Sequence, residues 1–265
     1  MGRMSNLDAV VALDQDERGL FHAHIGDEWM QGRTAYGGIS AAIALQAALD
    51  AEPGPQPLKC AQISFVGPVS GDCTVETNLV RESKSSRFIT CEVTSEAGFG
   101  THALFTFTGA RDSHVDHVRM PMPDVPPPEA LEPIPDHPAR PNFTRQFDMR
   151  PVTGPAIDFG QEKAELLVWV RFIDEPQCDP AVALLALGDA LPPAAIALFT
   201  KLGPISSMNW TVHMLTAKPE TRDGWWLLHS HSRYVSGGFS AQEMMLWNRD
   251  GDPIASGGQG VGVFV

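Results

Sequence analysis

Residues 37–66 read GGISAAIALQAALDAEPGPQPLKCAQISFV and contain the pattern that decides the fold. Two glycines precede a run of apolar and small residues, 39–49, which predicts a helix that packs closely against a sheet. The prolines and glycine of residues 53–57 end that helix. Residues 60–66 are rich in apolar and β-branched types, so a strand is predicted directly after the loop.

Three further strands are predicted in this half of the chain. The segments are rich in β-branched and aromatic residues, and Gly, Ser or Asp separates them; they are 74–82, 88–95 and 102–109. The first half therefore consists of one helix followed by four strands.

The second half repeats this order at an offset of roughly 150 residues, which favours an internal duplication. A strand is predicted at 166–173, and Asp179 with Pro180 marks the start of an apolar helix over 181–191. The pair Pro192 and Pro193 ends it. Four strands are predicted to follow, at 207–215, 225–234, 242–248 and 258–265, with a hairpin-like turn at Asp250-Gly251.

A proline-rich segment separates the two halves. It holds nine prolines between residues 112 and 142, which neither a helix nor a central strand accommodates. We therefore predict an N-terminal unit at 1–111, an extended linker at 112–142 and a C-terminal unit at 143–265. A long central helix wrapped by an antiparallel β-sheet describes the hotdog fold, so the predicted class is α+β with two fused hotdog units.

The composition excludes several classes of partner. The 265 residues include 19 Lys and Arg against 32 Asp and Glu, a net charge of −13, so the surface is unsuited to nucleic acid and to anionic membranes. The most apolar segment, 181–199, is interrupted by Asp189 and two prolines, which indicates a buried helix and no membrane span. The four cysteines have no zinc spacing, and no export signal is evident. We expect a cytoplasmic protein without metal or cofactor.

Four segments resemble, in order and spacing, the acyl-CoA thioesterase II family of double-hotdog thioesterases. They are GRTAYGGISAA (32–42), LALGDALPPA (185–194), SMNWTVHM (207–214) and ASGGQGVGVF (255–264). The resemblance covers nearly the whole chain. It implies hydrolysis of acyl-CoA to a free carboxylic acid and CoA.

Asp189 is the most informative candidate for a catalytic residue. The helix around it is apolar apart from Gly188, and a buried carboxylate is costly unless it has partners or a function. In the resembling family the matching Asp orients and activates a water molecule. The alternative interpretation is that Asp189 caps the segment 192–199 after the helix break.

The resemblance assigns two partners to this Asp, Ser207 and Gln259, which hydrogen-bond the same water molecule. Period-2 alternation along the strand, however, puts Ser207 on the face opposite Trp210, so Ser206 is held in reserve. Ser207 can also simply satisfy backbone at a strand edge, and Gln259 can lie in a flexible glycine-rich strand end. Asn209 departs from the family, since many relatives carry an acid there.

The first half contributes a different element, Gly37-Gly38 at a helix N-terminus. Free N–H groups there favour developing negative charge, so this pair is a candidate oxyanion hole, although it can also serve only the turn and close packing. The helix of the first half carries no acid that matches Asp189, and Leu58 falls where Ser207 would. One active site per chain is expected.

The proposed reaction is direct attack of water on the thioester, without a covalent intermediate. Asp189 is the base or water orienter, Ser207 and Gln259 fix the water, and the Gly38 amide polarises the carbonyl. Alternatives are a hotdog protein that only binds acyl thioesters and a thioesterase that acts on acyl-carrier protein. A hydratase or dehydratase would need a His on the site helix, which has none.

Other polar groups are weaker candidates. His22 with His24 and His229 with His231 share strand faces but have no metal-binding partner in the nearby sequence. Three cations, Arg81, Lys84 and Arg87, can meet CoA phosphates or be solvated loop charges. Of Trp225 and Trp226, one is expected in the core and the other at a subunit interface, in line with a dimer or tetramer.

Overall fold

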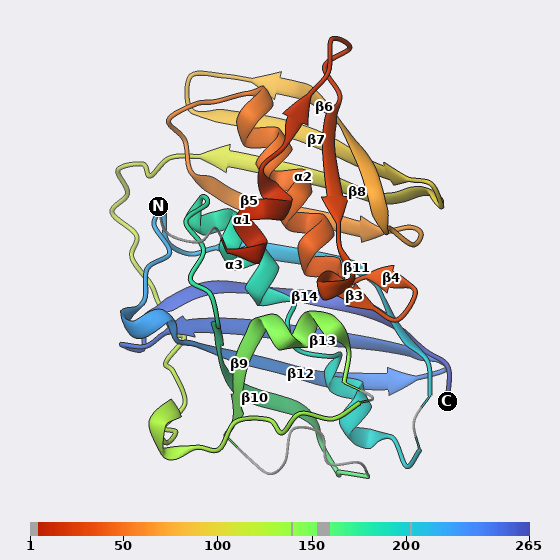
Figure 1. The fold of residues 1–265 in the computed structure, drawn as a ribbon. Coiled ribbons are helices and arrows are strands. Elements are labelled where there is room, and N and C mark those ends of the chain that lie inside the picture. The colour runs from red at the N-terminus through yellow and green to blue at the C-terminus, as the bar shows by residue number, and fades with distance from the viewer. Residues whose placement is uncertain (1–4, 139, 153–159, 202) are drawn as a thin grey trace.

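The computed structural model describes residues 5–138, 140–152, 160–201 and 203–265. In this part of the chain one antiparallel sheet of twelve strands wraps around two helices (Figure 1). The helices are α2 (Gly37–Ala51) and α3 (Pro180–Gly188). In spatial order the strands are β1 (Asp14–Gln15), β2 (Phe21–Ile25), β6 (Gly71–Glu82), β7 (Ser86–Ser95), β8 (Gly98–Thr108), β5 (Leu58–Phe65), β11 (Ile205–Met214), β14 (Pro253–Val263), β13 (Phe239–Asn248), β12 (Trp226–Ser236), β10 (Ala164–Phe172) and β9 (Phe147–Pro151).

The strand order repeats, which confirms the predicted fold class of two hotdog units. The order β2-β6-β7-β8-β5 around α2 matches β10-β12-β13-β14-β11 around α3. The two half-sheets join where β5 pairs with β11, with Asn209 opposite Ser64 and His213 opposite Cys60. The centre of the joined sheet therefore faces the two helices, which contact each other.

Both predicted helices are present, and α3 is shorter than predicted. Its start is as expected, since the Asp179 side chain accepts a 2.8 Å hydrogen bond from the Ala181 N–H and Pro180 takes the first position. It ends at Gly188, with Asp189 as its C-cap, although the sequence indicated residue 191. Prolines at 192 and 193 donate no backbone hydrogen bond and restrict the residue before them, so the last turn unwinds early.

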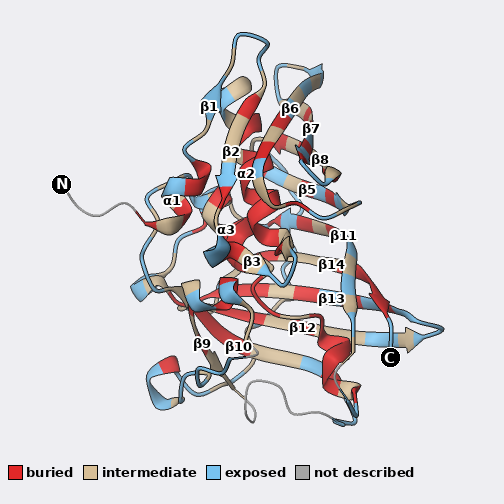
Figure 2. Ribbon diagram, turned by 45° about the vertical axis from the view of Figure 1, so that its right-hand side comes forward, coloured by how far each residue is buried: buried red, intermediate tan, exposed pale blue. Residues whose placement is uncertain are grey.

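The main core lies between the helices and the concave face of the sheet. Figure 2 shows α2 and α3 as mostly buried elements at the centre of the molecule. Ten of the fifteen residues of α2 are buried, because the helix has the sheet on one side and α3 on another. No helix in the described ranges is long and apolar enough to cross a membrane.

The proline-rich segment contains the short 3-10 helix η2 (Pro128–Ala130), and it packs on the outer face of the C-terminal half-sheet. The indole N–H of Trp169 donates to the Pro126 carbonyl (3.0 Å), and that of Trp247 donates to the Met120 carbonyl (2.9 Å). Beneath it lies Trp225, whose exposed fraction is 2%. The expectation that one of the paired tryptophans faces a subunit interface is therefore wrong, since Trp225 is covered by the chain itself and Trp226 packs against the main core.

Several N-terminal elements were not predicted from the sequence. They are α1 (Asn6–Val11), the strands β1 and β2, and the short hairpin of β3 (Met30–Gln31) with β4 (Thr34–Ala35). The strand β9 was missed as well. The predicted turn at Asp250-Gly251 is confirmed: it joins β13 to β14, and Gly251 has the positive φ of 91° that the turn requires.

Candidate active site

Asp189 lies where α3, the start of α2 and β14 meet. Its Oδ1 accepts a 2.6 Å hydrogen bond from Gln259 Nε2, and the Gly38 N–H donates to the same carboxylate. Burial raises the pKa of Asp189 from 3.8 to about 7, and the two hydrogen bonds oppose that rise. The residue as a whole is partly exposed, whereas its carboxylate is buried. A carboxylate with a pKa near neutrality can take a proton from water and release it again.

The structural alternative for Asp189 is not borne out. The segment after the helix break forms the 3-10 helix η4 (Ala194–Leu198), whose N-cap is Pro193 and which has no side-chain capping hydrogen bond. Asp189 therefore does not cap η4. Its carboxylate contacts come from β14 and α2 instead.

Gln259 connects Asp189 to two further polar side chains. Its Oε1 accepts hydrogen bonds of 3.0 Å from Ser207 Oγ and of 3.0 Å from Gln242 Nε2. Its Nε2 is left to donate to Asp189. Gln259 is 5% exposed, and its amide oxygen and nitrogen are both hydrogen-bonded. It therefore does not lie in a flexible strand end.

Ser207 reaches this network because β11 contains a β-bulge. Ser207 pairs with Val261 and Asn209 pairs with Gly260, so Met208 is an extra residue on β11. The bulge shifts the alternation, and Ser207 faces the same side as Trp210. The strict period of two, which separated these residues, is therefore wrong here.

Ser206 and Asn209 lie outside the network. The exposed Ser206 hydroxyl donates to the Ser207 carbonyl at 3.5 Å. The Asn209 Oδ1 accepts a 3.1 Å hydrogen bond from the Gly260 N–H, on the strand that carries Gln259. Asn209, the position at which this chain differs from many relatives, therefore contacts the neighbouring strand and does not lie beside Asp189.

Glycines at the start of α2 allow the two units to approach each other. A Cβ at Gly37 would lie 2.8 Å from Asp189 Oδ2 and 2.5 Å from Phe65 Cζ. A Cβ at Gly38 would lie 2.7 Å from the carbonyl oxygen of Ala186 in α3. A side chain at Gly38 would therefore push α2 away from α3, and one at Gly37 would displace the Phe65 ring or the Asp189 carboxylate.

Two residues of the site were missed in the sequence, Tyr36 and Gln242. Tyr36 is the N-cap residue of α2, and its hydroxyl donates 2.9 Å to the Ala186 carbonyl, which ties the two helices together. Its ring stacks on Phe143 at a centroid distance of 4.2 Å. Burial, with the charge of Asp189 as a smaller cause, raises the pKa of Tyr36 well above its ordinary value.

Gln242 lies on β13 and is 5% exposed. Its Oε1 accepts a 2.8 Å hydrogen bond from the Ala194 N–H at the start of η4. A signal for this residue existed in the sequence, because period two places Gln242 on the same face as the apolar Met244 and Leu246. A polar residue on the inward face of a strand needs a partner, and Gln259 is that partner.

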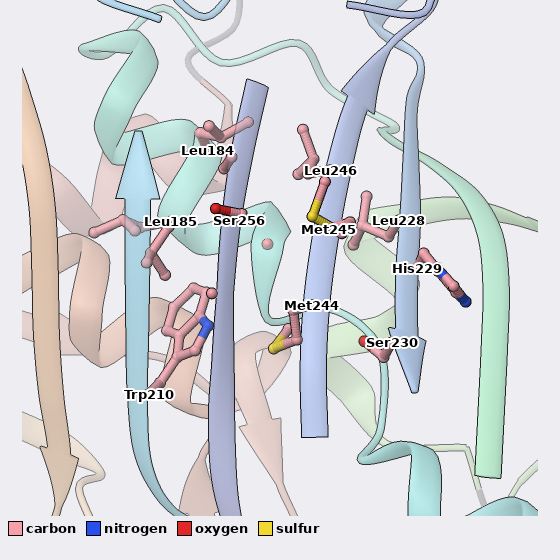
Figure 3. A pocket seen from close by; sticks show the side chains of 14 residues that line it. Leu184, Leu185, Trp210, Leu228, His229, Ser230, Met244, Met245, Leu246 and Ser256 are labelled. Atoms are coloured by element: carbon pink, nitrogen blue, oxygen red, sulfur yellow. The ribbon is translucent and has the colours of Figure 1, made fainter. Parts of the chain in front are cut away.

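An apolar cavity of about 30 Å³ lies between α3 and the C-terminal half-sheet, one residue from Asp189. Figure 3 shows Leu184 and Leu185 of α3 facing Trp210 and Met244 across it. Gly188, which precedes Asp189 in the chain, also lines the cavity.

Of the three predicted cations, Arg81 and Lys84 are exposed, and their role stays a prediction, whereas Arg87 is buried. Arg87 is 2% exposed and donates to the Glu52 carbonyl just after α2, with its guanidinium over the Phe107 ring. Arg87 is therefore not a solvated loop charge, and its guanidinium is turned inward and away from solvent.

The paired histidines have acid partners that the sequence did not indicate. His24 Nδ1 lies 2.6 Å from Asp72 Oδ1, and His229 Nε2 lies 2.8 Å from Glu165 Oε1. Within the described ranges no group of three or more His, Cys, Asp or Glu side chains is arranged to hold a metal ion. These pairs are separate from the Asp189 network.

Comparison with family models identifies the chain. Residues 25–108 match the acyl-CoA thioesterase N-terminal domain, and residues 128–263 match the acyl-CoA thioesterase C-terminal domain. The protein belongs to this family, as the sequence resemblance indicated, and membership supports thioester hydrolysis. No curated protein matches the sequence.

Solved structures share the fold over the full length. A hotdog-fold protein of unknown function from Alicyclobacillus acidocaldarius is 26% identical with a TM-score of 0.87, covering 99% of each chain. A putative thioesterase II from Thermobifida fusca is 17% identical with a TM-score of 0.83, covering 100% of each chain. A TesB protein from Mycobacterium avium subsp. paratuberculosis is 17% identical with a TM-score of 0.80, covering 98% of this chain and 99% of its own.

Proposed function

We propose that the protein hydrolyses acyl-CoA thioesters to the free acid and CoA by direct attack of water at Asp189. The observation that carries this proposal is a carboxylate with a pKa of about 7, fixed by Gln259 and by the Gly38 N–H. It is supported by family membership and by the apolar cavity that Gly188 lines. No covalent intermediate is needed, because water itself is the nucleophile.

The hydrogen-bond directions suit a water nucleophile. Ser207 gives its hydroxyl proton to Gln259, so its remaining lone pairs can only accept, and the ionised Asp189 also accepts. A water molecule between them donates one proton to each. Its lone pair is then free to attack the thioester carbonyl carbon.

The proton and the leaving group balance without a metal or cofactor in this proposal. Asp189 takes a proton as the bond between water oxygen and the acyl carbon forms, which gives a tetrahedral oxyanion. The C–S bond then breaks, and Asp189 returns the proton to the thiolate of CoA. The products are a carboxylic acid and a thiol.

The donor for the oxyanion is reassigned in the proposal. The Gly38 N–H, expected from the sequence to polarise the substrate carbonyl, donates to Asp189 instead. The Gly37 N–H opens the same helix and has no side-chain cap. With the positive end of the α2 dipole it is the proposed donor to the carbonyl oxygen.

The apolar cavity offers the acyl group a place out of water. Each CH₂ buried there contributes roughly 0.8 kcal/mol to binding. The cavity is small, about 30 Å³, so a longer chain requires the flexible Met244 to move.

Substituting Ser207 tests the proposed reaction. In an assay of thiol release from acyl-CoAs of short, long and aromatic chains, Ser207→Ala is expected to lower kcat by about ten- to hundredfold, because the water loses one acceptor. Ser206→Ala is the matched control and should retain the wild-type rate, since Ser206 does not contact Gln259.

Absence of thiol release by the wild-type protein, with acyl-CoA bound, would reject the enzyme in favour of an acyl-thioester-binding protein. Thiol release from acyl-carrier protein substrates but not from acyl-CoA would show that the substrate is the acyl-carrier protein thioester. Equal losses in the two serine variants would reject the water site.

Gly37→Ala tests the approach of α2 to the carboxylate. The added methyl group would occupy the space beside Asp189 Oδ2, so thiol release is expected to fall by about a hundredfold, the loss typical of a displaced oxyanion donor. The free energy of unfolding should fall by no more than about 3 kcal/mol, since the Phe65 ring can move. Gly109→Ala is the control, as a Cβ there meets nothing within 4 Å. Retained activity in Gly37→Ala would contradict the Gly37 N–H as the donor to the carbonyl oxygen.

A further inference from the structure

We propose that Gln242 is a positioning residue that fixes the orientation of the Gln259 amide, and with it the directions of the hydrogen bonds that Gln259 makes to Asp189 and Ser207. This inference rests on the proposed function, because the orientation of the Gln259 amide affects catalysis through the proposed water molecule, which donates to Ser207 and Asp189. Gln242 touches neither in the structure, and it acts through Gln259.

The chain of hydrogen bonds has fixed polarity at both ends. At one end the Ala194 backbone N–H can only donate, and it donates to Gln242 Oε1 at 2.8 Å. At the other end the ionised Asp189 can only accept. Between them the Gln242 amide must present its NH₂ group to Gln259, which accepts through Oε1 and donates through Nε2 to Asp189.

Without Gln242 the Gln259 amide can also reverse when Asp189 is protonated, because the carboxylic acid can donate to Gln259 Oε1. In the reversed arrangement its Oε1 faces the Asp189 carboxylate and its NH₂ group faces Ser207. The carboxylate then loses a donor and meets a carbonyl dipole, which favours its protonated form. The Ser207 hydroxyl would accept from Gln259 and turn its proton toward the water, whose lone pair would no longer be free.

The anchor of this chain is rigid. The Ala194 N–H opens η4 directly after Pro192 and Pro193, and both Ala194 and Gln242 are buried. A chain of hydrogen bonds that starts at a buried backbone N–H is fixed by the fold and does not depend on a mobile side chain. The prolines after α3 thus have a second effect, since they place this N–H group.

The charged groups around Asp189 are few. Tyr36 is the titratable side chain that faces it from the start of α2, and the pKa of Tyr36 is raised. The neighbours contributed by the strands are neutral: Phe65 from β5, Ser207 from β11 and Gln259 from β14. A change in the titration of Asp189 in a Gln242 variant therefore reports on the Gln259 amide.

The experiment measures the pKa of Asp189 by carbon-13 NMR of its side-chain carboxyl, assigned with Asp189→Asn, alongside kcat for thiol release. Gln242→Met keeps the volume and removes both hydrogen bonds. We expect the pKa of Asp189 to rise by about half a unit to one unit and kcat to fall about tenfold or more, with KM changed less than about twofold. The alkaline displacement of the pH-rate profile should equal the NMR shift.

The matched control is Ser240→Ala on the same strand. Ser240 is fully buried, and its hydroxyl pairs with Ser232 at 2.7 Å, outside the Asp189 network. It therefore reproduces the loss of a buried hydrogen bond with the pKa of Asp189 and kcat unchanged. A Gln242→Met variant that behaves like Ser240→Ala in both measurements would overturn the proposal.

A double-mutant cycle tests whether Gln242 acts through Gln259. In the Gln259→Met background, the further change Gln242→Met is expected to alter the pKa of Asp189 and kcat little, because the amide to be directed is gone. Full additivity of the two effects would contradict a positioning role.

A second variant covers the case in which Gln242→Met does not fold. Ala194→Pro removes the anchoring N–H at the first position of η4, where proline is tolerated, and leaves the Gln242 side chain intact. The same upward pKa shift is expected, and an unchanged pKa would overturn the proposal. The NMR titration needs no turnover, so it tests the positioning role even if the protein hydrolyses no thioester. Absence of hydrolysis would reject the proposed function, and an unchanged pKa of Asp189 would reject the positioning role.

Discussion

Asp189→Asn is expected to lower kcat for acyl-CoA hydrolysis by about 10²- to 10⁴-fold, the range for loss of a general base. The amide keeps the size of the carboxylate and can still accept from Gln259, but it cannot take a proton from water. Asp179→Asn is the matched control. Asp179 begins the same helix, and Asn also serves as an N-cap, so activity should be retained.

The pH dependence of the wild-type rate gives an independent check of the same role. Burial holds the pKa of Asp189 at about 7, and the base must be ionised to act. The value of kcat/KM should therefore fall about tenfold per pH unit below that pKa and level off above it. A profile that is flat between about pH 5 and pH 8 would contradict Asp189 as the base.

The second large effect is on stability, and Asp189→Asn should make the protein more stable at neutral and alkaline pH. The folded pKa of about 7 exceeds the ordinary 3.8, so between these values the folded state binds more protons than the unfolded state. Stability therefore declines as pH rises from about 4 to about 7. The difference of about three pKa units corresponds to up to about 4 kcal/mol.

Urea unfolding at pH 4 and pH 8 measures this effect. The free energy of unfolding of Asp189→Asn, relative to wild type, should increase by up to about 4 kcal/mol between the two pH values. Asp179→Asn should show no such change, as Asp179 is exposed and lies at the far end of α3. If the stability of the wild type relative to Asp189→Asn does not decline as pH rises, the Asp189 carboxylate ionises in the folded protein at little cost. That result would contradict the raised pKa.

The two predicted effects, on activity and on stability, have the same cause. A carboxylate held at a raised pKa destabilises the folded protein and is poised for proton transfer at neutral pH. The same substitution is expected to remove the activity and restore the stability. An enzyme site is distinguished in this way from a structural acid, whose loss would lower stability.

Much of the architecture was readable from local patterns. The apolar run after Gly37-Gly38 and the Asp179-Pro180 start indicated both central helices, and the structure contains them as α2 and α3. The strands after each helix followed from β-branched and aromatic composition. The unit boundaries at residues 111 and 142, and the dimer or tetramer, stay predictions.

The candidate site was predictable in part. Asp189 stood out because an acid in an apolar helix is costly. Ser207 and Gln259 came from the family resemblance, and Gly37-Gly38 came from its place at a helix N-terminus. The structure brings these residues together, and their part in catalysis stays a prediction until the variants are measured. Gln242 and Tyr36 were missed, because their partners are distant in sequence: Gln259 and Ala194 for one, Ala186 for the other.

The sequence by itself determined the duplicated order of helix and strands, because propensity, proline placement and periodicity act over a few residues. Only the tertiary structure decided which polar groups meet. The bulge at Met208 turns Ser207 inward, and it arises from the pairing of β11 with β14, which alternation along one strand cannot reveal. The raised pKa of Asp189 likewise depends on burial between α2, α3 and the sheet, a property of the packed units and not of any one segment.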